Sequence, residues 1–101
     1  MGVQDDGTIV QCDFEIFGKV QGCGFTKYCR DNCSNLNIKG WVKNSKKGTI
    51  VGKMQGPKPE IGKMVEWLSR QGSPGSEIQN AEFSNWGTIQ KYAFTDFSIR
   101  F

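Results

Sequence analysis

The stretch from Gly18 to Thr26, called here the glycine loop, carries the residues of this chain best suited to bind an anion. It holds three glycines, which let the backbone approach a ligand closely, and a helix-like run begins near its end. The first N–H groups of a helix lack partners within the helix, and the helix dipole places positive charge beside them. The spacing is neither that of a Walker loop nor that of a dinucleotide-binding fingerprint. The stretch therefore predicts a cradle for a phosphate or carboxylate, and the alternative is a glycine-rich turn that binds nothing.

Four cysteines stand at positions 12, 23, 29 and 33 and could form two disulfides. An intracellular chain with an adequate core usually keeps such thiols reduced, so we expect none. Cys29 and Cys33 are helix neighbours, but the chain has no His and no C-x-x-C pair to complete a zinc site. We therefore expect no metal and no cofactor. Cys23, in the loop at a helix start, is either a packing residue or a reactive thiol.

Length and charge limit the remaining possibilities. With 101 residues the chain fits one domain with a single core. The net charge of +3 mildly favours small anionic ligands but is far below the basic stripe of a nucleic-acid binder. No apolar run is long enough to span a membrane, and residues 1–8 lack a signal-peptide core. We expect a cytoplasmic monomer that binds neither nucleic acid nor membrane.

Two patterns place the glycine loop between a strand and a helix. Apolar and polar residues alternate from Thr8 to Phe17, which predicts a half-buried strand ending at Gly18. From Phe25 to Leu36 apolar residues recur at helical spacing and predict one buried helix face. That face comprises Phe25, Tyr28, Cys29, Cys33 and Leu36.

The rest of the chain continues the alternation of strands and helices. Residues 38–44 and 49–55 read as strands joined by the short connection 45–48, which is typical of a hairpin. A second helical stripe follows Pro57 and Pro59 and ends near Gly72. Its apolar residues are Ile61, Met64, Val65 and Leu68. Two further strand-like runs cover 78–86 and 93–101.

The resulting order is βαββαβ plus a last strand. Right-handed crossovers then place both helices on one face of a mainly antiparallel sheet, which is the ferredoxin-like sandwich of the α+β class. We expect one domain over residues 9–101 and a flexible N-terminus over residues 1–8.

These residues, in this order, resemble the acylphosphatase family, small ferredoxin-like enzymes that hydrolyse the carboxyl-phosphate bond of acyl phosphates without a metal. Ile16 to Gly22 looks like the family's phosphate-loop signature, and Gly40 to Asn44 followed by Gly48 looks like its second signature. Further matches are Gly72-Ser73-Pro74, Phe83-Ser84-Asn85 and Phe97-Ser98-Ile99-Arg100. The resemblance covers nearly the whole chain and implies a hydrolase that binds a small acyl phosphate or inorganic phosphate.

The resemblance also implies roles for particular residues. The backbone N–H groups of the loop would cradle the phosphoryl group, and they belong to Lys19, Val20, Gln21, Gly22, Cys23 and Gly24. Asn44 matches the family's catalytic Asn, which orients the attacking water. A side-chain amide is suited to that work because it both donates and accepts hydrogen bonds. On composition alone, Asn44 reads as a residue that enters a hairpin.

The sequence departs from the family pattern at Thr26, which stands where the catalytic Arg belongs. A threonine donates one hydrogen bond but brings no charge, so the resemblance implies reduced or absent activity. Arg30 lies one helical turn later and is either a substitute cation or a surface residue near Asp31. Lys19 and Lys27 are weaker candidates because a lysine lacks the guanidinium fork.

Three functions therefore remain open at this stage. The first is an acylphosphatase that works with another cation, and the second is a phosphate-binding or acyl-phosphate-binding paralogue of the same fold without turnover. The third is RNA binding, since the RNA-recognition sandwich shares this element order. We rank it last because residues 47–54 lack the aromatic pair that stacks bases.

Overall fold

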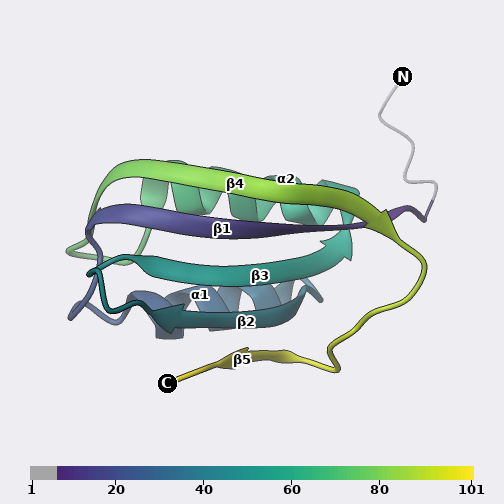
Figure 1. Cartoon of the computed structure of the whole chain (residues 1–101), viewed down its shortest axis with the longest axis horizontal. Helices are drawn as coiled ribbons and strands as arrows, with labels where there is room; N and C mark the ends of the chain where they lie inside the picture. Colours follow the sequence, from purple (N-terminus) through teal and green to yellow (C-terminus); the bar gives the residue numbers. More distant parts are fainter. Residues whose placement is uncertain (1–6) are drawn as a thin grey trace.

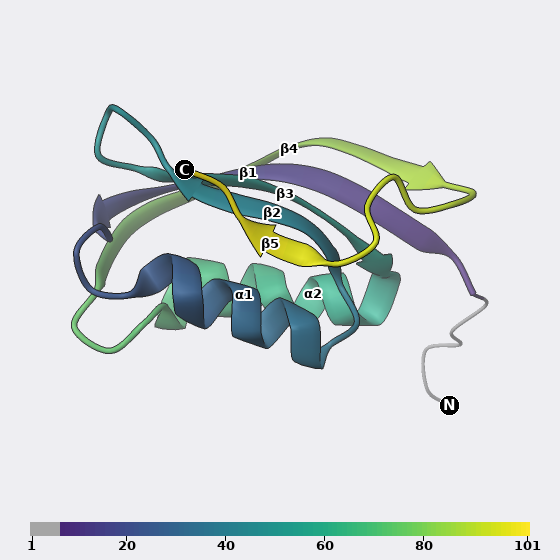
Figure 2. The ribbon, with the colours of Figure 1, turned by 90° about the horizontal axis from the view of Figure 1, so that it is seen from below.

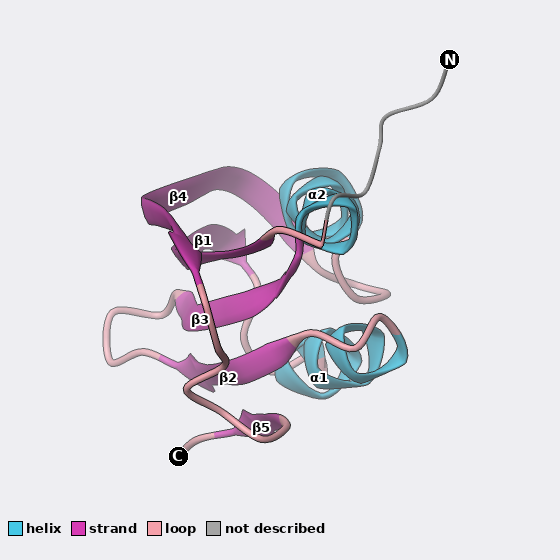
Figure 3. Ribbon diagram, turned by 90° about the vertical axis from the view of Figure 1, so that its right-hand side faces the viewer, coloured by secondary structure: helices cyan, strands magenta, loops and turns pink. Residues whose placement is uncertain are grey.

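The computed structural model describes residues 7–101, so most of the N-terminal segment predicted to be flexible lies outside the described residues. The elements are β1 (Ile9–Lys19), α1 (Phe25–Asn35), β2 (Lys39–Asn44), β3 (Ile50–Pro57), α2 (Lys58–Glu66), the π-helical turn η1 (Trp67–Gln71), β4 (Glu77–Ile89) and β5 (Phe97–Ile99). The strands form one sheet in the order β4-β1-β3-β2-β5 (Figure 1). Both helices cover the same face of the sheet (Figures 2 and 3). The predicted ferredoxin-like α+β fold is confirmed.

The pairing within the sheet is mainly antiparallel. β1 pairs with β3 and β4, and β2 pairs with β3, all in antiparallel register, whereas β5 runs parallel to β2. The turn 45–48 joins β2 to β3 as the predicted hairpin. β1 is therefore a central strand, and it delivers the glycine loop to one end of the sheet.

The alternation predicted for β1 is confirmed. Val10, Cys12, Phe14 and Ile16 are buried on the side of the sheet that the helices cover. Gly18, near the end of the strand, has a φ of 130°, and a β-carbon there would collide with the carbonyl oxygen of Glu77. β4 therefore approaches β1 closely only because position 18 carries no side chain.

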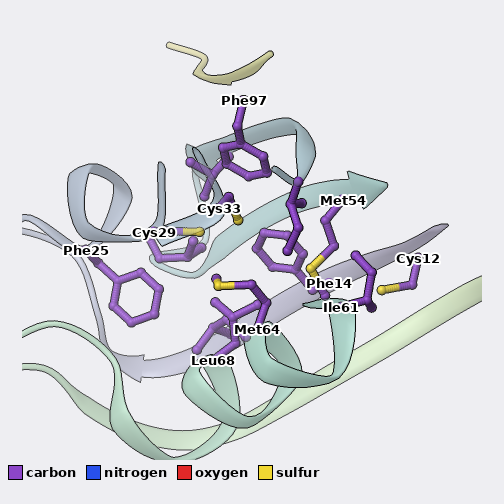
Figure 4. Packing of buried hydrophobic residues seen from close by; sticks show 14 of the residues in the cluster. Cys12, Phe14, Phe25, Cys29, Cys33, Met54, Ile61, Met64, Leu68 and Phe97 are labelled. Atoms are coloured by element: carbon purple, nitrogen blue, oxygen red, sulfur yellow. The ribbon is translucent and has the colours of Figure 1, made fainter. Parts of the chain in front are cut away.

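The core lies between the sheet and the two helices (Figure 4). α1 contributes Phe25, Cys29 and Cys33, and the Phe25 ring packs on Trp67 with centroids 5.2 Å apart. α2 and η1 contribute Ile61, Met64 and Leu68, as the helical stripe predicts.

The prediction that Tyr28 belongs to the buried face of α1 is wrong, because its side chain is 46% exposed. At about 100° per residue, Tyr28 sits about 60° round the helix from Phe25, on the side away from Cys33. It therefore falls at the edge of the apolar stripe, where the sheet does not cover it.

The last strand is shorter than the alternation from Ala93 to Phe101 predicts. Only residues 97–99 form β5, opposite Gly40, Trp41 and Val42. Ala93 donates its N–H to the Gln55 side chain (2.9 Å) rather than to a neighbouring strand. At the other end Arg100 N–H donates to Val42 O, and its guanidinium lies 4.7 Å from the centre of the Trp41 ring.

All four cysteines are free thiols. Cys12, Cys29 and Cys33 are completely buried, whereas Cys23 is half-buried. Burial is the main cause that raises the pKa of Cys12 to about 12 and the pKa of Cys33 above its usual range. Cys12 and Cys33 are therefore protonated packing residues at neutral pH.

The face of the sheet away from the helices carries an ion pair across its central strands. Asp13 on β1 lies 2.8 Å from the Lys53 ammonium on β3 and accepts a hydrogen bond from Asn85 on β4 (2.7 Å). Burial raises the pKa of the Asp13 carboxyl, but Lys53 and Asn85 together outweigh it, so the net pKa is lowered. This contact links three neighbouring strands.

Candidate active site

The irregular part of the glycine loop, residues 20–24, runs from the end of β1 into the first turn of α1. Gly24 is the N-cap of α1 and has a left-handed backbone with a φ of 74°. No side chain caps this helix start, and its first turn holds no acidic residue. The N-terminal N–H groups of α1 are thus left without the internal anion that often satisfies them.

The backbone donors of the loop are also free. Within the part of the chain that the structure describes, the amides of Gln21, Gly22, Cys23 and Gly24 donate no hydrogen bond. Successive N–H groups at a helix start form a concave site that favours phosphate or carboxylate. The predicted cradle needs such free donors, and anion binding there stays a prediction.

The Gln21 side chain fastens this loop to the β2–β3 hairpin. Its Nε2 donates to Ser45 O and to Thr49 O, at 2.9 Å in both cases. These two carbonyls flank the turn of the hairpin. The loop and the hairpin lie at the same end of the sheet (Figures 1 and 2), and Gln21 joins them directly.

A chain of hydroxyl groups holds the hairpin itself. Thr49 Oγ1 donates to the Glu15 carboxylate (2.7 Å), and Ser45 Oγ lies 2.6 Å from Thr49 Oγ1. Because the Thr49 proton is used on Glu15, the Ser45 hydroxyl donates to Thr49. Ser45 Oγ in turn accepts the N–H groups of Lys47 and Thr49. The turn is therefore fixed from within and from β1.

Asn44 is the last residue of β2 and comes directly before this fastened turn. It is paired in register with Ile50 and is exposed. Its side-chain amide has no hydrogen-bond partner among the described residues. The Asn44 amide is therefore free to bind a water, next to a turn that Gln21 joins to the glycine loop, and its catalytic role stays a prediction.

Arg30, Lys19 and Thr26, the side chains considered for the charge of the site, make no hydrogen bond with the free amides of the loop among the described residues. Arg30 pairs with Asp31, with two guanidinium nitrogens each 3.1 Å from Asp31 Oδ1, on the surface of α1. Lys19 ends β1 in an exposed position. Thr26 is half-buried in the first turn of α1, and among the described residues its hydroxyl has no partner.

Val20 and Cys23 attach the glycine loop to the rest of the fold. Val20 is completely buried in the core. Cys23 Sγ lies 3.3 Å from the hydroxyl of the buried Ser73 and 3.5 Å from Val20 O. Cys23 therefore links the loop to the segment that precedes β4.

The parts of Gln21, Ser45, Thr49 and Glu15 are the features that sequence reasoning missed. The sequence predicts only a backbone role for Gln21, and it predicts no role for Ser45 and Thr49 at the hairpin or for Glu15 on β1. The available signal was Ser45 and Thr49 at the two ends of one short turn, since hydroxyl side chains commonly hydrogen-bond nearby backbone there.

Residues 12–99 of the chain match the profile of the family described as acylphosphatase. This chain belongs to the acylphosphatase family. Acylphosphatase-2 from Homo sapiens is 46% identical to it over 89 residues, which cover 88% of this chain and 90% of the human protein. Acylphosphatase-2 from Mus musculus is 47% identical over 89 residues, with coverage of 88% and 84%.

Solved acylphosphatase structures have the same fold. An acylphosphatase from Coxiella burnetii superposes with a TM-score of 0.80 at 29% identity and covers 98% of this chain and 100% of its own. The acylphosphatase from Bacillus subtilis gives a TM-score of 0.83 at 26% identity, with coverage of 91% and 99%. No helix within residues 7–101 is both long and apolar enough to cross a membrane.

Proposed function

We propose that this acylphosphatase-family protein hydrolyses acyl phosphates to a carboxylate and phosphate. The observation that carries the proposal is the row of free amides from Gln21 to Gly24, at an uncapped helix start that Gln21 ties to the hairpin after Asn44. This arrangement supplies a phosphoryl site and a water-positioning group from two rigid elements.

In the proposed reaction, a water oxygen attacks phosphorus and forms the new P–O bond. The bond from phosphorus to the acyl oxygen breaks, and its electron pair leaves with the carboxylate. The free backbone N–H groups of residues 21–24 and the positive end of α1 stabilise the negative charge on the phosphoryl oxygens. The Asn44 amide orients the water, and the water's protons pass to the phosphate and to solvent.

Thr26 limits this activity in our proposal. The resemblance places it at the position of the family's Arg, and its hydroxyl offers one donor without charge. Arg30 is the strongest of the predicted substitutes because it carries a guanidinium, but it would have to leave its exposed ion pair with Asp31. Breaking such a pair costs about 1 kcal/mol or less, so Arg30 is available to a bound anion.

One specific observation favours a second candidate, a phosphate binder of the same fold without turnover. The amides of residues 21–24 are free to bind an anion, whereas the guanidinium of Arg30 is paired with Asp31. Binding would then survive while hydrolysis is lost.

The deciding experiment is hydrolysis of a small acyl phosphate by the purified chain without added metal, alongside a titration with inorganic phosphate followed by amide shifts. We expect phosphate to shift the amides of residues 21–24 and turnover to be measurable but slow. Phosphate binding there without any turnover would favour the binder. If phosphate perturbs only amides elsewhere, the cradle assignment is wrong.

A further inference from the structure

Tyr28 is an exposed aromatic side chain beside the glycine loop. Its N–H donates to Gly24 O (3.1 Å), so it sits one turn into α1. Its ring carbons Cε2 and Cδ2 lie 3.7 and 3.8 Å from the point that a β-carbon on Gly24 would occupy. The side chain of Tyr28 is 46% exposed, whereas those of Phe25 and Cys29 on the same helix are buried. Folding therefore places an aromatic ring at the loop without using it in the core.

A small cavity opens at this ring. Its volume is about 280 Å³, and it is lined by Lys27, Tyr28 and Asp31. This volume is just below the roughly 300–1,000 Å³ found for ligand sites, so the cavity suits a fragment of about one ring. The Asp31 carboxylate is already paired with Arg30, so it is not an unpaired charge facing a ligand.

The geometry of an acyl phosphate relates the Tyr28 ring to the cradle. When the amides of residues 21–24 hold the phosphoryl group, the acyl carbon is one bridging oxygen away and must lie at the rim of the loop. The Tyr28 ring beside Gly24 offers an apolar flat surface at that rim. Flat groups stack on aromatic rings with about 0.5–1.5 kcal/mol beyond the burial of apolar area.

We infer that Tyr28 binds the acyl group and makes this site selective for acyl phosphates whose acyl group is flat and apolar, such as a benzoyl group. This inference rests on the proposed function, because it needs the phosphoryl group to occupy the cradle. Tyr28 is then a specificity-determining residue, and its side chain takes no part in the attack on phosphorus.

The test compares two non-hydrolysable probes, phenacylphosphonate and acetonylphosphonate, in which CH₂ replaces the bridging oxygen. Binding of each probe and of inorganic phosphate is measured by calorimetry and by amide shifts for the unmodified chain, Tyr28→Ala and Tyr28→Phe. We expect Tyr28→Ala to lower the affinity ratio of phenacylphosphonate to acetonylphosphonate by about two- to tenfold, the equivalent of one stacking contact. Tyr28→Phe keeps the ring and should keep the ratio.

Trp86→Ala is the matched control, since Trp86 is another exposed aromatic residue (53%) but lies on β4. It should leave the ratio unchanged. An unchanged ratio in Tyr28→Ala, with phosphate still shifting the amides of residues 21–24, would overturn this inference and leave the proposed function standing. If none of the three ligands shifts those amides, the cradle is wrong and the inference falls with it.

Discussion

In the proposed mechanism, position 26 decides how much positive charge the site presents to a phosphoryl group. Replacing Thr26 by Arg adds a guanidinium in the first turn of α1, beside backbone donors that are already in place. A forked, charged donor stabilises phosphoryl oxygens more strongly than a neutral hydroxyl, so acyl-phosphate hydrolysis should rise about a hundredfold or more in Thr26→Arg. Initial rates with one acyl phosphate, measured without metal, check this prediction. Stability should change little because Arg is a better helix former than Thr.

Arg30→Ala provides the matching control in the unmodified chain. If Arg30 remains with Asp31 during turnover, this variant keeps the slow rate of the unmodified protein. If Arg30 supplies the missing charge, the variant loses that rate, and Thr26→Arg gains little because two arginines compete for one anion. A Thr26→Arg protein that folds and binds phosphate yet hydrolyses nothing would point to the non-catalytic binder.

In the proposed mechanism, Asn44 orients the attacking water and adds little to the packing of the fold. It is exposed, and its side chain has no partner within the described residues, so Asn44→Ala should change the free energy of unfolding by only about 0.5 kcal/mol or less. Loss of the group that orients the water should lower hydrolysis by about a hundredfold or more. Asn35→Ala, which removes another exposed Asn at the end of α1, should have normal turnover. Equal turnover in both variants would exclude Asn44 from the mechanism.

Single residues of this site differ in how far the sequence alone could place them. The glycines and the following helix start predict the cradle because backbone conformation and helix ends follow local rules. The side-chain bonds from Gln21 to Ser45 and Thr49 span 24 and 28 residues, and no local pattern encodes them. The sequence offers the contact of Arg30 with Asp31 only as one alternative, because adjacent residues on a helix lie about 100° apart and do not normally face each other.

At the level of the elements, the side chain of Gln21 joins the glycine loop to the β2–β3 hairpin, and we expect these bonds to hold the shape of the loop. Gln21→Ala removes both hydrogen bonds between the loop and the hairpin, each worth about 0.5–1.5 kcal/mol. If the loop loses about 1 kcal/mol of the stabilisation that keeps it ordered, phosphate affinity should fall about fivefold. A phosphate titration followed by calorimetry measures it.

Gln21→Glu tests the same tie without changing the size of the side chain. It replaces the donating amide by an acceptor facing two carbonyls, so it should weaken phosphate binding at least as much as Gln21→Ala. Gln71→Ala, at the exposed end of η1, should bind phosphate normally. Tight binding in both Gln21 variants would show that the loop holds its shape without the hairpin.

The elements themselves were predictable where one face is buried and unpredictable where tertiary pairing decides. β1 follows its alternation because every second residue packs against the helices. The run from Ala93 to Phe101 alternates equally well, but only the part opposite Gly40 to Val42 finds a strand partner. The prediction that Tyr28 is buried is wrong for a related reason. Periodicity places Tyr28 at the edge of the apolar stripe but does not show how far the sheet extends over that stripe.

At the scale of the molecule, the Asp13 contact couples sheet stability to acid. The folded pKa of Asp13 is below its ordinary value of 3.8, so its stabilising contribution is complete above that value and is lost as the pH falls through the folded pKa. Asp13→Asn removes the charge, and the difference in unfolding free energy from the unmodified chain should shrink below pH 3.8. We expect that difference to stay under about 1 kcal/mol at neutral pH because the two side chains are about one third exposed (32% for Asp13, 28% for Lys53).

Urea unfolding of both proteins at about pH 7 and about pH 3 measures this difference. Glu66→Gln serves as the control, since the Glu66–Arg70 pair is far more exposed (64% and 81%) and should give no measurable difference at either pH. A difference for Asp13→Asn that is as large at pH 3 as at neutral pH would contradict the assignment.

Because three of the four cysteines are buried in the fold, thiol labelling reports how far the chain has unfolded. Of the four cysteines that an alkylating reagent could meet on the folded chain, Cys23 is half-buried, while Cys12, Cys29 and Cys33 are completely buried. Thiolate is the form that alkylates, and the raised pKa values of Cys12 and Cys33 make it scarce there until the chain opens. Mass spectrometry would then count one tag on a molecule that has stayed folded and four on a molecule that has opened fully. Intermediate counts would show whether the β1 thiol and the two α1 thiols become accessible together or separately.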